Sequence, residues 1–241
     1  MTETFGRISE LNPSQSSTWE SRLFLTFDID WACDDVLADT IDLVEQEHAD
    51  VAATWFVTHD TPLLARLRAN PKFELGIHPN FNFLLNGDPR NGKDPQEVID
   101  RLVEIVPEAK SIRTHCMLQS SKLLQMFCDN GFTHDCNHFI PEQSDIHLRP
   151  WFLWNGLIKI PHFWEDDLAF IYKNDTPMQV IMSRPGLRVF DFHPIHVYLN
   201  TEDSSRYEKA RDNFHRPSEL LKLRNESSGT RTLLQSLLGM S

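Results

Sequence analysis

The sequence predicts an α/β fold: a distorted, partly open barrel of about seven parallel strands, followed by a polar helical C-terminal extension. Short apolar stretches alternate with amphipathic stretches, and the links between them are short. This alternation is typical of a parallel sheet covered by helices. About seven strand candidates suit a barrel better than a three-layer sandwich. No glycine-rich turn follows the first strand, which disfavours a dinucleotide-binding fold.

The individual elements follow from local patterns. The strand candidates are dense in apolar and β-branched residues and span 22–28, 51–57, 73–77, 111–114, 132–135, 157–160 and 187–192. The helix candidates repeat apolar residues at helical spacing and comprise 35–48, one helix opened by Thr61-Pro62, one opened by Asp94-Pro95, and 120–130.

The last part of the chain is polar, and we expect residues 201–241 to be helical. Pro217 is expected to start one helix there, and Gly229 to interrupt the helical segment. We predict one domain over residues 1–241, with its core at about 22–196 and the extension at 197–241.

Composition limits the functional classes. The net charge of -12 and a pI of about 5.3 argue against broad binding to nucleic acid or anionic membranes, which requires clustered Lys and Arg. Residues 1–17 are polar, without the apolar core of a secretion signal, and no apolar stretch is long enough to span a bilayer. The four cysteines form no C-x-x-C pair. These features predict a cytoplasmic protein with reduced thiols.

Ionisable residues gather where the predicted strands end. Parallel strands place their carboxyl ends on one face, and in a barrel that face carries the active site. The residues at these ends are Asp28, Asp30, His59, Asp60, His78, Arg113, His115, His134, Asp135, His162 and His193. The sequence therefore predicts one catalytic face.

Several of these strand ends match a known family in order along the chain. The chain resembles the polysaccharide deacetylases, also called the NodB-homology family or carbohydrate esterase family 4, over about residues 22–196. The matching segments are Thr26–Asp30 (TFDID), Ala53–Val57 (ATWFV), Glu74–Pro79 (ELGIHP), Arg113–His115 (RTH), Trp164 with Asp166, and Phe190–Pro194 (FDFHP).

The resemblance implies a metal-dependent hydrolase that removes an N-acetyl or other acyl group from a sugar, such as a glycan precursor or a surface polysaccharide unit. The expected substrate is an acylated amino sugar. By the resemblance, Asp28 is the general base, Arg113 orients it, and His193 is the general acid. The ring of His193 titrates near neutral pH, which suits that role. His196, three residues on, is a second candidate for the acid.

The resemblance also implies a divalent metal, with Asp30 and His78 as ligands. Asp28 and Asp30 lie on the same side of an extended strand and would repel each other unless a cation or an arginine accompanies them. The acids here form D-x-D, and Asn82 stands where the family has its second metal histidine. Asn82 is the expected third ligand, and His115 could instead supply it or contact the substrate. Zinc is the default ion, although a mixed nitrogen and oxygen site also suits iron, cobalt or nickel.

Four further residues are expected near the substrate: Trp31, Trp164, Asp166 and His196. The two indole rings are candidates for stacking on a sugar, and Asp166 is a candidate for orienting His193. Two other functions stay open. One is a metal-free amide hydrolase of the same fold acting on a non-sugar amide, and the other is a non-catalytic sugar-binding relative.

Overall fold

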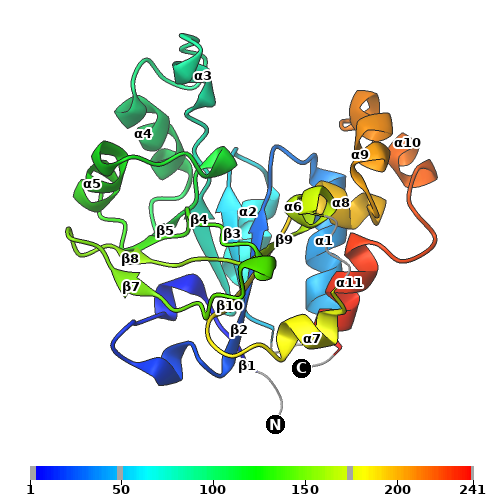
Figure 1. Cartoon of the computed structure of the whole chain (residues 1–241). Coiled ribbons are helices and arrows are strands. Elements are labelled where there is room, and N and C mark those ends of the chain that lie inside the picture. Colours follow the sequence, from blue (N-terminus) through cyan, green and yellow to red (C-terminus); the bar gives the residue numbers. More distant parts are fainter. Residues whose placement is uncertain (1–3, 48–50, 173–175, 240–241) are drawn as a thin grey trace.

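The computed structural model describes residues 4–47, 51–172 and 176–239. Its centre is a ten-stranded sheet with the order β7-β8-β6-β5-β4-β3-β2-β10-β9, and β1 pairs with β2 beside this path (Figure 1). The strands are β1 Thr4–Phe5, β2 Arg22–Asp28, β3 Ala53–Val57, β4 Phe73–Ile77, β5 Ser111–Ile112, β6 His134–Asp135, β7 Trp151–Phe152, β8 Ile158–Lys159, β9 Trp164–Glu165 and β10 Arg188–Phe192.

The predicted fold class is confirmed. Every strand pair of the sheet is parallel except β7 with β8. The seven expected strands are present as β2, β3, β4, β5, β6, β8 and β10. The structure adds β1, β7 and β9, each of two residues.

The central strands β2 and β10 pair over five positions, from Arg188 opposite Leu23 to Phe192 opposite Phe27. Both strands are buried along almost their whole length, so they read as apolar runs without alternation. The Phe27 ring stacks on Trp55 with 4.2 Å between ring centroids. This packing holds the middle of the sheet, and with it the strand ends that carry the site.

Helices flank the sheet on both sides. The α-helices are α1 Asp34–Glu47, α2 Leu63–Ala69, α3 Asn82–Leu85, α4 Pro95–Ile105, α5 Ser121–Asp129, α6 Asp166–Tyr172, α7 Met178–Met182, α8 Pro194–Leu199, α9 Ser204–Ala210, α10 Pro217–Lys222 and α11 Thr230–Leu238. Short 3₁₀ turns are η1 Ile8–Glu10, η2 Ser16–Thr18, η3 His115–Met117, η4 Glu142–Ser144 and η5 Arg211–Asn213. No helix in the described ranges is long and apolar enough to cross a lipid bilayer.

The C-terminal extension forms the helices α9, α10 and α11, which gather beside α8 and α1 (Figure 1). Pro217 starts α10, as predicted, and Gly229 precedes α11 as its N-cap. A Cβ atom on Gly229 would lie 2.1 Å from the carbonyl oxygen of Asn200, so only glycine fits this approach. Asp39 on α1 pairs with both Arg224 and Arg231. The extension is therefore fixed against the barrel.

Candidate active site

The ends of four parallel strands bring the candidate residues together. Asp28 ends β2, and His78, Arg113 and His193 follow β4, β5 and β10. Side chains two positions apart in a strand point to the same side, so Thr26 accompanies Asp28 and Asp191 accompanies His193. Contacts among these residues place the predicted general base, the arginine and the predicted general acid on one face.

Arg113 lies at the centre of a fully buried cluster. Its Nη1 atom donates hydrogen bonds to Asp28 Oδ1 at 3.0 Å, to Thr26 Oγ1 at 3.0 Å, and to Asp191 Oδ1. The guanidinium also lies over the Phe56 ring, 4.6 Å from its centroid. Burial raises the pKa of both carboxyl groups, and that of Asp191 reaches about 7 although Arg113 opposes the rise. The orientation of Asp28 by Arg113 thus has a direct geometric basis.

A second group forms beside this cluster from Asp30, His78 and His115. Asp30 Oδ1 lies 3.3 Å from His78 Nε2 and 3.4 Å from His115 Nδ1, and the two ring nitrogens are 3.3 Å apart. Asp30 Oδ1 is buried and accepts no hydrogen bond of good geometry within the described ranges. Each of the three residues offers one ligand atom, and these atoms lie within 4.8 Å of one another. One carboxylate and two imidazoles are donors that suit zinc and similar divalent ions.

The second ring nitrogen of His78 supports the same interpretation. His78 Nδ1 lies 3.4 Å from Asp28 Oδ2, which leaves Nε2 directed at the Asp30 side. In metal sites, a carboxylate near one nitrogen often accompanies a histidine that binds the ion through the other, although His78 Nδ1 forms no hydrogen bond of good geometry in the described ranges.

The charges of the group also suit a cation. Burial lowers the pKa of His78 to about 3, so its ring is neutral, as a ligand must be. Burial would lower the pKa of His115 as well, but Asp30 outweighs it and raises that pKa to about 10. The proton on His115 thus compensates the Asp30 carboxylate, and a divalent ion would take its place.

The loops that carry Asp30 and His115 adopt an unusual backbone. Asp30 and Trp31 have φ values of 35° and 55°, and Cys116 and Met117 have 57° and 53°. Residues other than glycine rarely occupy this left-handed region, and strain of this kind concentrates at functional sites. Both loops therefore turn sharply at or next to the residue, Asp30 or His115, that they contribute to the candidate metal site.

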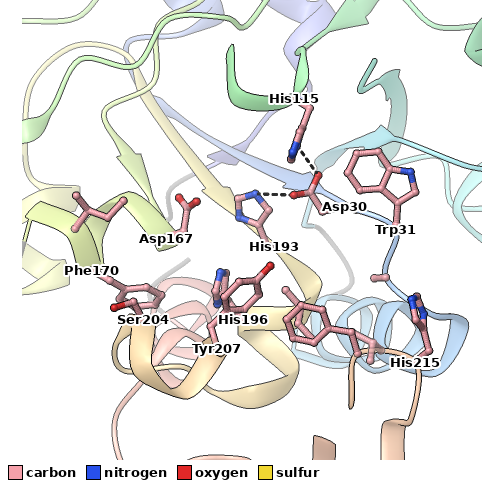
Figure 2. Close-up of a pocket in the computed structure, with 15 residues that line it drawn as sticks. Asp30, Trp31, His115, Asp167, Phe170, His193, His196, Ser204, Tyr207 and His215 are labelled. Atoms are coloured by element: carbon pink, nitrogen blue, oxygen red, sulfur yellow. Dashed lines mark ion pairs between the residues drawn. The ribbon is translucent and has the colours of Figure 1, made fainter. Parts of the chain in front are cut away.

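Asp166 holds His193, which approaches the Asp30, His78 and His115 group from the side of Asp30 Oδ2. Asp166 accepts hydrogen bonds from the His193 backbone N–H at 2.8 Å and from Nδ1 at 2.7 Å. The other ring nitrogen, Nε2, lies 3.7 Å from Asp30 Oδ2 (Figure 2). Burial would lower the pKa of His193, but the Asp166 carboxylate outweighs it and raises the pKa well above the ordinary value. Nε2 is thus held protonated and faces the group.

The structure distinguishes the two candidates for the third ligand. His115 Nδ1 lies among the ligand atoms of the group. Asn82 begins α3, and its side chain contacts the Cys116 thiol. The structure therefore brings His115 next to the ligand atoms of Asp30 and His78, whereas the expected ligand Asn82 contacts Cys116.

The residues expected near the substrate divide between pocket and core. Trp31 and His196 line a pocket next to Asp30 and His193. Trp164 instead is buried, with its ring centroid 4.8 Å from that of Phe192, and it does not line this pocket. Asp166 is buried under His193 and not among the pocket residues. The expectation that Trp164 and Asp166 lie at the substrate is corrected, because Trp164 packs in the core and Asp166 lies under His193. The expected contact of Asp166 with the His193 ring is present.

Two buried residues of the Arg113 cluster were not among the predicted site residues, namely Thr26 and Asp191. Both lie two positions before a predicted catalytic residue on the same strand. That spacing was the available signal, because period-two alternation places them on the same side. Conversely, some strand-end residues point elsewhere. His134 contacts the backbone carbonyl oxygen of Leu11, and Asp135 pairs with Lys159.

A family model for WbmS-like polysaccharide deacetylases matches residues 25–211. The chain belongs to this family. Its members are hydrolases that act on carbon–nitrogen amide bonds of carbohydrates, so the chain is a polysaccharide deacetylase by family.

Solved structures give two further comparisons. WbmS from Bordetella bronchiseptica, described as a polysaccharide deacetylase involved in O-antigen biosynthesis, is 45% identical over 98% of both chains, with a TM-score of 0.90. A polysaccharide deacetylase from Mycobacterium smegmatis is 16% identical over 90% of both chains, with a TM-score of 0.49. No curated protein matches this chain.

Proposed function

We propose that this deacetylase is metal-dependent and removes an N-acetyl or related acyl group from an amino sugar used to build a surface glycan of the O-antigen type. The observation that carries the proposal is the Asp30, His78 and His115 group, which lies between Asp28 and His193. The surface-glycan role is supported by the description of the 45% identical relative. A cytoplasmic site of action remains part of the proposal.

Asp30, His78 and His115 would hold the ion through one carboxylate oxygen and two ring nitrogens. A divalent ion in such a site acts as a Lewis acid and lowers the pKa of water, and zinc remains the default. His78 contributes a neutral ring. The proton transfers described next involve protein side chains.

Asp28 serves as the general base in this proposal. Arg113 occupies its Oδ1 atom, which leaves Oδ2 to accept the proton of the water that attacks the acyl carbon. Burial raises the pKa of Asp28, which makes the carboxylate a better proton acceptor than an exposed aspartate. Asp191 and Thr26 accept hydrogen bonds from the same Nη1 atom and help to hold Arg113 in place.

His193 serves as the general acid. Nδ1 donates to Asp166, so the proton that reaches the leaving amine nitrogen comes from Nε2. Asp166 also accepts the His193 backbone N–H, and the ring therefore has one orientation. Asp28 and His193 lie close together, with one carboxylate oxygen and one ring nitrogen within 4.8 Å of each other, so the base and the acid can act on the same amide bond.

The deciding experiment combines metal analysis with acetate release from acetamido sugars. Wild type and Asp30→Ala are compared, and Asp60→Ala is the control because Asp60 is an exposed acid at the same edge of the sheet. We expect stoichiometric metal and turnover in wild type and in Asp60→Ala, and neither in Asp30→Ala. Turnover that survives full metal removal would favour a metal-free amide hydrolase. Sugar binding without turnover would favour a non-catalytic relative.

A further inference from the structure

The cavity beside the catalytic groups has a wall that the proposed chemistry does not explain. It has a volume of about 500 Å³ and opens next to Asp30, His115 and His193. Pockets of about 300–1,000 Å³ enclose most of the surface of one small ligand. Figure 2 shows Trp31 on one side of Asp30, Phe170 on the other, and Tyr207 with His215 beyond them. Part of this wall comes from the C-terminal extension.

The wall contains a continuous row of aromatic rings. Phe170 on α6 contacts His196 on α8 at 5.4 Å between ring centroids, His196 contacts Tyr207 on α9 at 4.8 Å, and Tyr207 contacts Phe214 at 4.8 Å. His196 in turn lies 5.8 Å from the ring of His193. We call these four residues, Phe170, His196, Tyr207 and Phe214, the aromatic wall. It leads directly from the general acid into the cavity and offers flat apolar faces of the kind on which the C–H face of a sugar ring packs.

The C-terminal half of the aromatic wall is held firmly in place. Asp203 caps α9 by accepting hydrogen bonds from the backbone N–H groups of Ser205 and Arg206. The Arg206 side chain bonds Glu202 and the backbone carbonyl oxygen of Leu223. Tyr207 is thus presented from an anchored helix, and a built surface faces the catalytic groups.

The charges of the cavity limit what it encloses. Its acidic lining residues are Asp30 and Asp167, and no lysine or arginine occurs among the described residues that line it. Asp167 Oδ1 is buried and has no hydrogen-bond partner within the described ranges. A hydroxyl or amide N–H of a sugar would satisfy Asp167.

We propose that the cavity binds a single, terminal acylated sugar residue, and that Tyr207 and Phe214 of the extension determine this preference. The inference rests on the proposed deacetylase function. A sugar in the interior of a polymer continues in two directions, and one of them meets the aromatic wall. A terminal residue continues in one direction only and leaves through the open mouth of the cavity.

The test uses N-acetylated hexosamines of gluco, galacto and manno configuration, each as a methyl glycoside and as a short oligomer. Mass spectrometry locates the sugar residues that lose acetate. We expect wild type to deacetylate the monosaccharide and only the terminal residue of the oligomer. Tyr207→Ala with Phe214→Ala should raise KM for the monosaccharide roughly tenfold, since each removes buried apolar contact. It should also release acetate from interior residues.

Two controls make the result specific. Tyr207→Phe keeps the ring and should keep the preference for the terminal residue. Leu221→Ala changes an exposed residue of the same extension outside the cavity and should behave as wild type. Equal rates on interior and terminal residues in wild type would overturn the inference while leaving the deacetylase function intact. A wild-type enzyme that releases no acetate from any of these saccharides would overturn the proposed function and the inference together.

Discussion

Two buried clusters at the same edge of the sheet pair a cation with carboxylates, and they differ in charge balance. Arg113 contacts two carboxylates, Asp28 and Asp191. Lys159 pairs with one carboxylate, Asp135, and donates a further hydrogen bond to Gln119 Oε1 at 2.6 Å. Both cations are almost fully buried.

The clusters also differ in how completely their polar atoms are satisfied. Arg113 Nε, Arg113 Nη2 and Asp191 Oδ2 are buried and have no hydrogen-bond partner in the described ranges. Around Lys159, in contrast, Asp135 Oδ1 accepts the N–H of Asn137, and Asn137 Oδ1 accepts the N–H of Thr114. A network whose charges balance and whose polar atoms are all hydrogen-bonded is suited to a structural role. A cluster with more carboxylates than cations is suited to bind a cation and to transfer protons. We infer that the first cluster serves chemistry and the second holds the loop that begins at Thr114.

The largest effect on metal binding and turnover is expected from substituting His115. This residue lies in the loop that the Lys159 cluster holds, at the point where that loop reaches the site. His115→Ala should lose stoichiometric metal and reduce turnover to background, because it removes one of three ligands. Asn82→His should leave metal affinity unchanged, since Asn82 faces Cys116. Titration with a chelator compares the two variants. Tighter metal in Asn82→His together with normal metal in His115→Ala would reverse the assignment.

Asp28→Asn should lower kcat roughly 10⁴-fold, near the upper limit for loss of a general base, while metal content stays at the wild-type level. The amide side chain keeps the shape and the contact with Arg113 but accepts no proton. Steady-state kinetics and elemental analysis on the same preparation check both parts. Loss of metal in this variant would show that Asp28 is a ligand and that the two acids have exchanged roles.

His193→Ala should lower the rate on amide substrates roughly 10²–10³-fold, within the range usual for a general acid. The loss on an activated aryl ester should be smaller, because a phenolate leaves without a proton. Asp166→Asn should also slow the amide more than the ester, but by a smaller factor than His193→Ala. The reason is that this substitution weakens the hydrogen bond that orients the His193 ring. Equal losses on ester and amide would remove the general-acid role and point to His196.

Lys159→Met should change kcat less than any of these substitutions and destabilise the fold instead. Removing one partner of a buried ion pair typically costs about 3–5 kcal/mol of unfolding free energy. Combining it with Asp135→Leu should recover most of that loss, because no unpaired charge is then left buried. Denaturant unfolding measures both variants. A loss in kcat as large as that of Asp28→Asn, with stability unchanged, would place the Lys159 cluster with the chemistry.

Much of the site was predictable from local patterns. Apolar runs located the strands, and parallel topology then required Asp28, His78, Arg113 and His193 to meet at one edge. This inference needed no knowledge of how distant segments pack, because strand direction and strand ends are local properties. The same reasoning would have found Asp191, two positions before His193.

The remaining assignments depended on contacts between distant parts of the chain. His115 reaches Asp30 because its loop turns through left-handed backbone at Cys116 and Met117, while Asn137 holds the start of that loop at Thr114. Trp164 and Trp31 both stand next to acidic residues in the sequence, so their neighbours did not tell them apart. Packing against Phe192 nevertheless buries Trp164 in the core. The aromatic wall likewise joins rings from separate helices.

The sequence by itself determined the fold class, the catalytic edge and most of its ionisable residues, because periodicity and strand ends are encoded within a few neighbouring positions. Tertiary structure alone decided the approach of His115 to Asp30 and His78 and the closure of the cavity by the C-terminal extension. These features depend on the paths of loops, and a loop path is set by left-handed residues and long-range hydrogen bonds that leave no periodic pattern in the sequence.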